Sequence, residues 1–234
     1  MVNYDNLPLF PLQVVLYPDM TLPLHIFEPR YREMIRQCRE QNWVFGVLLD
    51  QNDGGARATE PGAIGTTARL TQLDVLHDGR MNIEVLGETR FKVVRTTQQT
   101  PYLSAKVEPF WEEMSDPTLL KSEFDAITEL FKTYLKSHFA RSNRSLSAVH
   151  LPREPEYLSY AVASFLQISL KEKQELLQMT NTQRRLRREI EILNKEIDAY
   201  SAWDRVEALN IFGDSRLNVM PVDTEALRKL SSLN

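Results

Sequence analysis

Two stretches near the N-terminus decide how the chain begins to fold: residues 7–12 are LPLFPL, and residues 22–35 are LPLHIFEPRYREMI. Prolines interrupt the short apolar runs, which is typical of strands at the edge of a sheet. The helix that follows can begin at Pro29, because proline is tolerated at the first helical position. One face of this helix carries an apolar stripe, which consists of Tyr31, Met34, Ile35 and Cys38. The order predicts short strands over 9–17, an apolar connection at 23–27 and then an amphipathic helix.

Residues 62–108 have the alternation of short, bent strands. The alternation slips between Leu70 and Leu73, which predicts a bulge or a bend in a curving sheet. Asp78-Gly79 predicts a hairpin turn, because glycine adopts a positive φ at low cost. The sequence GETR at 87–90 predicts a second turn. Strands that bend this often favour a small barrel over a flat sheet.

After residue 115 the apolar period changes to that of helices. Asp116 and Pro117 predict a helix start, and two capping-box patterns predict starts near 170 and 181. The last helix carries a heptad-like stripe of Leu186, Ile190, Leu193, Ile197 and Tyr200. We interpret this stripe as packing on the chain's own bundle, with dimerisation as the alternative. The chain thus divides into a β-rich subdomain (1–114), a helical bundle with a stem helix (115–200) and a C-terminal extension with short helices (201–234).

Composition indicates an ordinary globular protein of 234 residues, with 42% hydrophobic and 26% charged residues and a net charge of −4. A single cysteine, Cys38, excludes an internal disulfide and a multi-cysteine zinc site, and its place on the apolar stripe predicts a buried thiol. No segment has the pattern of a signal peptide or the length of a membrane span. The sequence therefore predicts a cytoplasmic protein without a membrane partner.

Four segments in this order resemble the N-terminal, PUA-like substrate-binding domain of the Lon proteases in its free-standing form. They are residues 7–12, LHIFEPRY at 24–31, GTTAR at 65–69 with DGR at 78–80 and GETRF at 87–91, and EKQELL at 172–177. The resemblance covers residues 5–200. It implies an α+β fold, in which a pseudo-barrel of about six strands precedes a helical bundle, and it implies recognition of unfolded or tagged polypeptide. A separate protease is a further partner that it suggests.

The enzymatic parts of a Lon protease have no counterpart in the sequence. None of the eight glycines belongs to the Gly-x4-Gly-Lys-Ser/Thr motif that cradles nucleotide phosphates, and no room is left for a Ser-Lys peptidase domain. We therefore expect no enzyme activity and no cofactor. The four histidines (His25, His77, His138 and His150) have no metal-ligand spacing, so no metal site is predicted.

Two charged features have both a functional and a simpler interpretation. The run from Arg184 to Arg188 could bind phosphate or an acidic partner, but i,i+4 pairs with Glu189 and Glu191 favour a solvated helix face. Glu112 and Glu113 could be paired catalytic carboxylates, but solvated charge is the favoured interpretation because general acid chemistry requires a cleft that shifts a pKa. Ser147 and His150 lie close in sequence, without a nucleophile-elbow motif.

The apolar segment before the first helix is the best candidate for a binding surface. Such residues can belong to the core, or they can line a groove for an extended apolar peptide. The candidate partner-binding residues are Pro23, Leu24, His25, Ile26, Phe27, Arg30 and Tyr31. The leading hypothesis is a non-catalytic polypeptide-recognition module that acts as an adaptor or holdase; the oligomeric state stays open.

RNA binding is the alternative function, because PUA-like barrels also occur in RNA-modifying proteins. Residues 1–115 carry 11 Lys and Arg against 15 Asp and Glu. An RNA-binding surface is normally basic, so nucleic acid is the less favoured partner. Hydrolysis is a third hypothesis, which turnover by purified protein would support.

Overall fold

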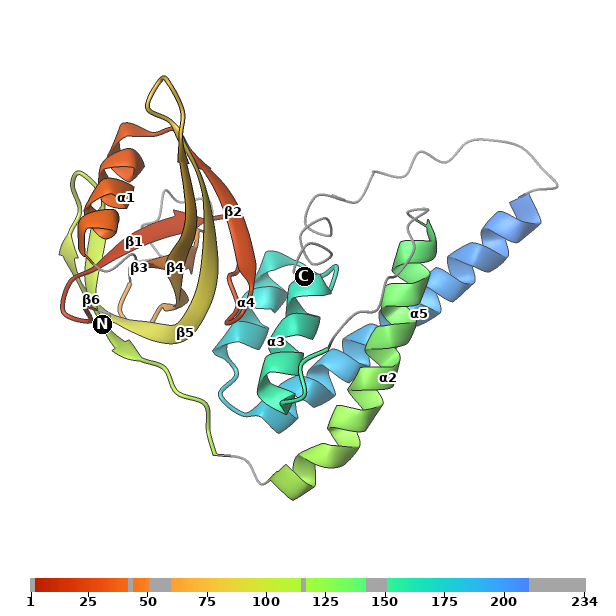
Figure 1. Cartoon of the computed structure of the whole chain (residues 1–234). Helices are drawn as coiled ribbons and strands as arrows, with labels where there is room; N and C mark the ends of the chain where they lie inside the picture. The colour runs from red at the N-terminus through yellow and green to blue at the C-terminus, as the bar shows by residue number, and fades with distance from the viewer. Residues whose placement is uncertain (1–2, 42–43, 51–59, 115–116, 142–150, 211–234) are drawn as a thin grey trace.

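The computed structural model describes residues 3–41, 44–50, 60–114, 117–141 and 151–210 (Figure 1). In this part of the chain a barrel-like sheet and a helical unit lie next to each other. The strands are β1 (Leu7–Leu12), β2 (Thr21–Ile26), β3 (Val44–Leu49), β4 (Ile64–Val75), β5 (Met81–Gln98) and β6 (Leu103–Pro109). The helices are α1 (Pro29–Gln41), α2 (Pro117–Arg141), α3 (Pro155–Phe165), α4 (Leu170–Gln178) and α5 (Thr182–Asn210).

The six strands form one mixed sheet in the order β2-β5-β4-β3-β1-β6. Among the strands in the described ranges only β1 and β3 run parallel, and every other pair is antiparallel. The sheet closes because the second half of β5 also pairs with β6, while its first half pairs with β2. The long, bent β5 therefore belongs to two sides of the barrel. The predicted α+β fold with a six-stranded pseudo-barrel is confirmed.

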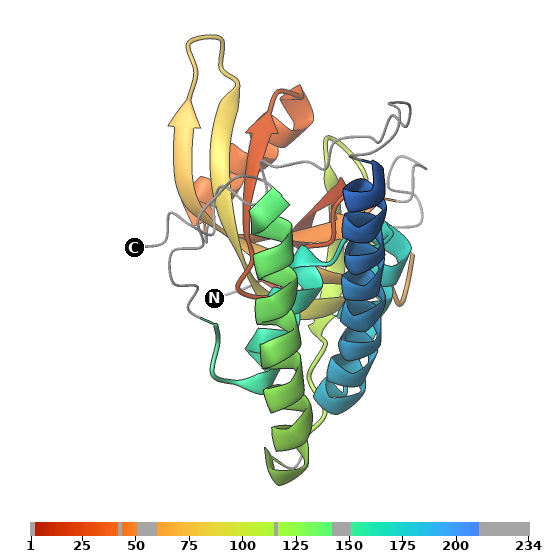
Figure 2. The ribbon, with the colours of Figure 1, turned by 90° about the vertical axis from the view of Figure 1, so that its right-hand side faces the viewer.

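The predicted bulge and hairpin are also confirmed. The register of β4 against β5 shifts between Thr66 and Ala68 and again between Leu70 and Gln72. At the tip of this hairpin Gly79 has a φ of 81°, which a residue with a Cβ rarely adopts. Figure 2 shows the β4–β5 hairpin projecting beyond the closed part of the barrel.

The second turn predicted at residues 87–90 is wrong, because β5 continues without a break from Met81 to Gln98. Gly87 is buried inside this strand, and a Cβ there would lie 2.1 Å from the carbonyl oxygen of Tyr17. The Gly87 N–H donates to the Met20 oxygen at 2.9 Å, and its carbonyl accepts from the Asp19 N–H at 2.9 Å. The glycine therefore admits another stretch of backbone against the strand.

The N-terminal strands also differ from the prediction. The first strand ends at Leu12, and Pro23 and Leu24 lie in β2 instead of in a connection. We expected a connection at residues 23–27 because prolines disrupt the regular hydrogen bonding between strands. At the edge of a sheet, however, a strand pairs on one side only, so that a missing N–H need not remove a ladder bond.

Helix α1 covers the barrel with the predicted apolar stripe. All four residues of the stripe are buried, with Met34 and Ile35 fully so. They pack in one cluster with residues of β2, β4 and β5, including Ile26, Leu70 and Met81. Burial raises the pKa of the Cys38 thiol to about 12, which agrees with the expectation of an unreactive thiol.

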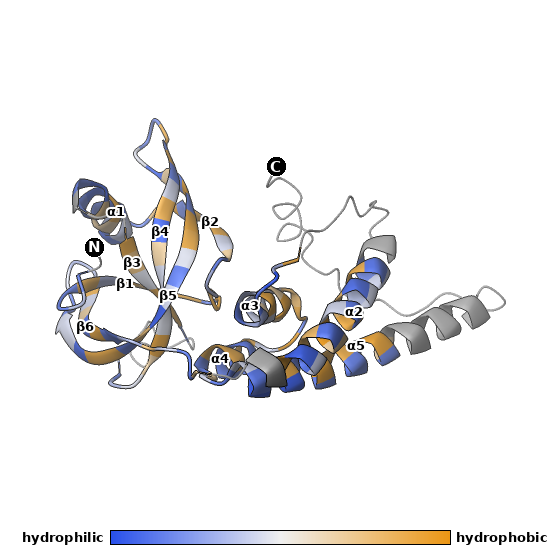
Figure 3. Cartoon of the chain, turned by 60° about the horizontal axis from the view of Figure 1, so that its bottom comes forward, coloured by the Kyte–Doolittle hydropathy of each residue, from blue (hydrophilic) through white to orange (hydrophobic). Residues whose placement is uncertain are grey.

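In the helical unit, α2 and α5 lie side by side and run in the same direction (Figures 1 and 2). Leu186 and Leu193 of the heptad-like stripe are completely buried in the bundle core, and Ile190 and Ile197 pack against it. Packing on the chain's own bundle is therefore the correct interpretation of this stripe. Figure 3 shows the hydrophobic residues of α5 on the side that meets the other helices.

The helix starts follow local hydrogen bonding. Ser169 and Glu172 form the predicted capping box of α4. For α5 the cap is Asn181, whose side chain accepts from the Arg184 N–H at 3.0 Å; Thr180 instead donates to Glu113. Helix α5 then continues to Asn210, across the boundary predicted at residue 201, because the sequence between them contains no glycine or proline. The predicted start at Asp116 and the pair Ser147 and His150 lie outside the described residues.

Candidate functional site

The seven residues predicted to contact a partner surround the end of β2 and the start of α1. Those with exposed side chains are Pro23, His25, Phe27 and Arg30. Leu24 is half-buried and packs against the core, whereas Ile26 is 1% exposed and Tyr31 is 6% exposed. Ile26 and Tyr31 are therefore core residues, as the first of the two interpretations held. The exposed four remain candidates for a surface contact.

An exposed aromatic pair marks the end of β2. The His25 ring stacks on the Phe27 ring with their centroids 6.2 Å apart, and Phe27 keeps 60% of its surface exposed. The Nδ1 atom of His25 lies 2.7 Å from Oδ1 of Asn82, so that His25 is held by the neighbouring strand β5. An exposed phenylalanine held beside an imidazole can contact an apolar side chain of another molecule.

Arg30 and Tyr31 lie in the first turn of α1, directly after this pair. The Arg30 guanidinium lies 4.5 Å from the Tyr31 ring centroid and pairs with Glu28 at 2.8 Å. Tyr31 packs on Phe10, with ring centroids 4.0 Å apart. Burial raises the pKa of Tyr31, with Arg30 opposing the shift. These contacts stabilise the junction between β2 and α1 beneath the exposed surface.

β2 is an edge strand of the sheet. In the described part of the chain it pairs only with β5, in a register that runs from Thr21 opposite Leu86 to Ile26 opposite Met81. The outer edge of such a strand presents backbone donors and acceptors that an added strand can use. Together, the exposed side chains and the open edge form a surface that we call the β2 edge surface (Pro23, His25, Phe27 and Arg30 on β2 and its junction with α1).

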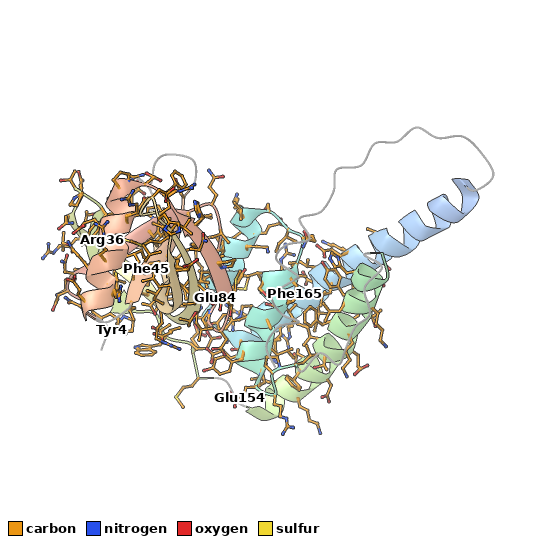
Figure 4. All side chains as sticks on the ribbon, turned by 45° about the horizontal axis from the view of Figure 1, so that its top comes forward. Tyr4, Arg36, Phe45, Glu84, Glu154 and Phe165 are labelled. Carbon is orange, nitrogen blue, oxygen red and sulfur yellow. The ribbon has the colours of Figure 1, made fainter. Side chains whose placement is uncertain are left out.

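A groove of about 490 Å³ lies between α1 and the β4–β5 hairpin. Its lining is apolar at the base and charged at the rim; the residues are Ile35, Arg36, Arg39, Glu40, Leu73, Val75, Gly79 and Met81. Val75 is 53% exposed on the hairpin side of the groove. In Figure 4 Arg36 lies on the α1 side of the barrel, away from the helical unit that carries Phe165. Our sequence prediction missed this groove, although an apolar Val75 just before the turn Asp78-Gly79 was a usable signal.

A cluster of buried charges joins the barrel to the helices. Glu112, which follows β6, pairs with Arg90 of β5 and with Arg185 of α5, the latter at 3.0 Å. The side chains of Arg90 and Arg185 are 3% and 0% exposed. Tyr160 donates to the same carboxylate at 3.2 Å, and the Arg185 guanidinium lies 4.3 Å from its ring centroid. Glu112 thus serves as the common anion for two buried arginines.

This cluster corrects two interpretations from the sequence. Arg185 is not part of a solvated helix face, and Glu112 is not a solvated charge. In the same run, Arg187 pairs with Glu123 of α2 at 2.8 Å. The predicted solvated face holds for Arg184 and Arg187, which stay exposed, and for Arg188, which pairs with Glu191 one turn along the helix; it fails for Arg185, whose partners come from other elements. Glu113, by contrast, is exposed as expected, and hydrogen bonds from Thr180 and Asn181 lower its pKa.

Glu189 extends the cluster into the bundle core. The Arg185 Nε–H donates to Oγ of Ser159 at 2.7 Å, and the Ser159 hydroxyl donates to Oε1 of Glu189 at 2.8 Å. The other carboxyl oxygen of Glu189 is buried with no hydrogen-bond partner among the described residues. Burial raises the pKa of Glu189 to about 8, with Arg185 opposing the shift. This carboxyl group therefore holds its proton near neutral pH.

The raised pKa of Glu189 predicts that stability falls as pH rises. The unfolded chain releases this proton near pH 4.5, whereas the folded protein keeps it until about pH 8. Between these values the folded state binds more protons, so the free energy of unfolding decreases with pH, by up to about 1.4 kcal/mol per pH unit. Urea denaturation from pH 5 to 8 measures this slope, and Glu189→Gln should flatten it. An unchanged slope in the variant would contradict the assignment.

Two further kinds of feature, a metal site and a membrane-spanning helix, are not found among the described residues. Among these residues no group of three or more His, Cys, Asp or Glu side chains is placed to hold a metal ion. Nor does any helix in the described ranges combine the length and the hydropathy that a membrane crossing requires.

Comparison with known proteins identifies the family. The model of the ATP-dependent protease La (LON) substrate-binding domain matches residues 6–195. The chain belongs to this family. The resemblance that the four sequence segments indicated is therefore confirmed, and the barrel, helices α1 to α4 and the first half of α5 lie within the matched residues.

Curated relatives of this Lon substrate-binding domain are full Lon proteases. The chain is 28% identical over 214 residues to the Lon protease of Buchnera aphidicola subsp. Baizongia pistaciae, covering 87% of this chain and 26% of the relative. It is 29% identical over 198 residues to the Lon protease of Brevibacillus choshinensis, covering 82% and 25%. The chain thus spans about a quarter of the length of these relatives.

Solved structures agree with the fold. A Lon N-terminal domain protein from Xanthomonas campestris superposes with a TM-score of 0.57 at 28% identity, over 78% of this chain and 95% of that one. The N-terminal domain of the Mycobacterium avium complex Lon protease superposes with a TM-score of 0.62 at 16% identity, over 81% and 98%. The second likeness shows the shared fold alone.

Proposed function

We propose that this Lon substrate-binding domain is a non-catalytic module that binds exposed apolar segments of other polypeptides. The observation that carries the proposal is the β2 edge surface, where an unpaired strand edge adjoins the exposed Phe27 and His25 rings. An extended client can hydrogen-bond to the strand edge and place an apolar side chain on Phe27. The module works in the cytoplasm without a nucleotide or a metal, as an adaptor, as a holdase or together with a separate protease.

Binding at this surface is weak for a single client segment. Burial of one large apolar side chain contributes about 1.5–3 kcal/mol, and part of this gain offsets the entropy lost when the client becomes ordered. Tethering to a protease, or several apolar segments in one client, would raise the apparent affinity. An unfolded protein therefore suits the site better than a short folded epitope.

Replacement of Phe27 tests the proposal. Phe27→Ser should weaken the binding of a fluorescent, leucine-rich peptide by about tenfold, because the main apolar contact is lost. Fluorescence anisotropy measures the dissociation constant. Trp111→Ser is a matched control, since Trp111 is 69% exposed and adjoins Glu112, which pairs with Arg90 and Arg185 at the junction of the barrel and the helices. Equal losses in both variants, or no binding by the unmodified protein, would refute the proposed surface.

RNA binding is less consistent with the charges of the barrel. Acidic side chains outnumber basic ones in residues 1–115 by 15 to 11, and carboxylates lie beside six of the basic groups, in pairs that join Arg30 to Glu28, Arg36 to Glu33, Arg69 to Glu88, Arg80 to Asp78, Lys92 to Glu108 and Lys106 to Asp5. An RNA-binding surface requires cations that are free to release counterions from phosphate. A gel-shift assay over a range of salt concentrations separates the two functions, and tight, salt-sensitive RNA binding would reverse our preference.

A further inference from the structure

The groove between α1 and the β4–β5 hairpin has a cationic rim that the β2 edge surface does not explain. Arg39 is exposed and forms no hydrogen bond or ion pair with the residues that the structure describes. Arg36 reaches Glu33 at 3.3 Å, and both side chains stay about half exposed. A surface pair of this kind is weak and is easily exchanged for another partner. Two guanidinium groups are thus available at one side of the groove.

A third arginine lies at the end of the groove, next to the hairpin turn. The Arg32 guanidinium approaches Gly79 so closely that a Cβ at Gly79 would lie 2.8 Å from its Nη2 atom. The Nε atom of Arg32 is buried without a hydrogen-bond partner among the described residues. Glu40 is the single carboxylate in the groove lining, against Arg36 and Arg39. The charge balance of α1 on this side therefore favours an anionic ligand.

The base of the groove is apolar and is part of the barrel wall. Ile35 and Met81 are buried core residues that reach the groove, and Leu73 and Val75 cover its hairpin side. A volume of about 490 Å³ accommodates a few side chains. Neither a free phosphate nor a nucleic-acid backbone would use such an apolar base. The combination fits a polypeptide segment in which apolar and acidic residues lie next to each other.

The groove and the β2 edge surface lie at the same end of the sheet. In the sheet Met81 is the partner of Ile26 on one side and of Val75 on the other. Phe27 follows Ile26, so Phe27 and Val75 are separated by about two strand spacings, which is roughly 10 Å. Three or four residues of an extended chain span this distance. His25 and Phe27 stack on the face of β2 opposite to Ile26, so a client segment that contacts both Phe27 and the groove must cross the edge of β2.

We propose that the groove selects acidic-apolar client segments, with Arg36 and Arg39 binding the carboxylates while Leu73 and Val75 bind the apolar side chains. This inference rests on the proposed function and specifies which clients the domain prefers. Charge complementarity here raises specificity more than affinity, because the cations are exposed to solvent. The preference for acidic segments should consequently weaken as the salt concentration rises.

The test uses short fluorescent peptides that share a leucine-serine core and carry aspartate, serine or lysine next to the leucines. We expect the aspartate peptide to bind the unmodified protein about five to ten times more tightly than the lysine peptide at low salt. Arg39→Glu should reverse this order, so that the lysine peptide binds more tightly. Arg95→Glu is the charge control, because Arg95 is an exposed arginine of β5 outside the groove, and it should leave the order unchanged.

A second pair of variants tests the apolar base. Val75→Asp should weaken the binding of the aspartate peptide about tenfold, whereas Val94→Asp, at another exposed valine of the barrel, should have little effect on binding.

The outcomes distinguish the groove proposal from the proposed function. If all three peptides bind equally and Phe27→Ser still weakens them, the proposed function stands and the groove proposal is wrong. If no peptide binds the unmodified protein, the proposed function itself fails.

Discussion

Replacing Arg185 with alanine is expected to lower the free energy of unfolding by about 3–5 kcal/mol. The substitution leaves the Glu112 carboxylate with only one of its two arginines, and it removes the guanidinium that donates to Ser159 and to the carbonyl oxygen of Met179. Buried polar groups that lose their partners retain the full cost of their desolvation. Urea denaturation followed by circular dichroism measures the change.

The arginine run itself provides the control for this experiment. Arg184 directly precedes Arg185 but is exposed, so Arg184→Ala should change stability by no more than about 0.5 kcal/mol. Arg185→Lys retains the charge but cannot reproduce the forked hydrogen bonds to Glu112 and Ser159, and it should recover only part of the loss. Similar effects of alanine at 184 and 185 would show that Arg185 does not stabilise the junction between barrel and bundle.

Replacing Gly87 with alanine is the second substitution with a large expected effect, about 3 kcal/mol of destabilisation. The added methyl group would lie 2.1 Å from the carbonyl oxygen of Tyr17 and 3.1 Å from its carbonyl carbon. Both atoms are backbone, so no side chain can rotate away. The segment before β2 must move from the barrel, and the hydrogen bonds between Gly87 and residues 19 and 20 must lengthen.

Gly62 separates this steric effect from the conformational effect of losing a glycine. Gly62 has a φ of 93°, and no atom lies within 4 Å of a Cβ built there. Gly62→Ala should therefore cost only about 1–2 kcal/mol, from the strained backbone alone. Thermal and urea denaturation of both variants compare the two effects. If Gly87→Ala is no more damaging than Gly62→Ala, the close approach at Gly87 does not constrain the barrel.

Local patterns predicted the elements well where neighbouring residues decide the outcome. The α1 stripe, the Asp78-Gly79 hairpin and the Ser169 capping box each depend on contacts within a few residues, and all three are confirmed. The turn predicted at Gly87 failed because the glycine is required by a chain segment that crosses from elsewhere in the fold. Glycine signals a special backbone environment, but its sequence context does not say whether that environment is a turn or a close contact.

The candidate site was predictable only in part. The apolar residues around Phe27 stand out in a segment rich in proline, but the sequence could not separate the exposed Phe27 from the buried Ile26 and Tyr31. Their exposure depends on which face of β2 meets α1. The groove combines α1 with the tip of the β4–β5 hairpin, and this juxtaposition follows from how the barrel closes.

Hydrophobic periodicity, turn residues and helix caps were sufficient to indicate a β-rich barrel followed by helices, because each of these signals acts over a few residues. The Lon substrate-binding family was likewise apparent from four short segments in order. The pairing of Glu112 with Arg90 and Arg185 was decided only in the folded chain, since the carboxylate lies 22 residues from one arginine and 73 from the other. Charges this far apart in the sequence are brought together only by the packing of the fold. Once they are buried away from water, an unpaired charge would be too costly, so they must be paired.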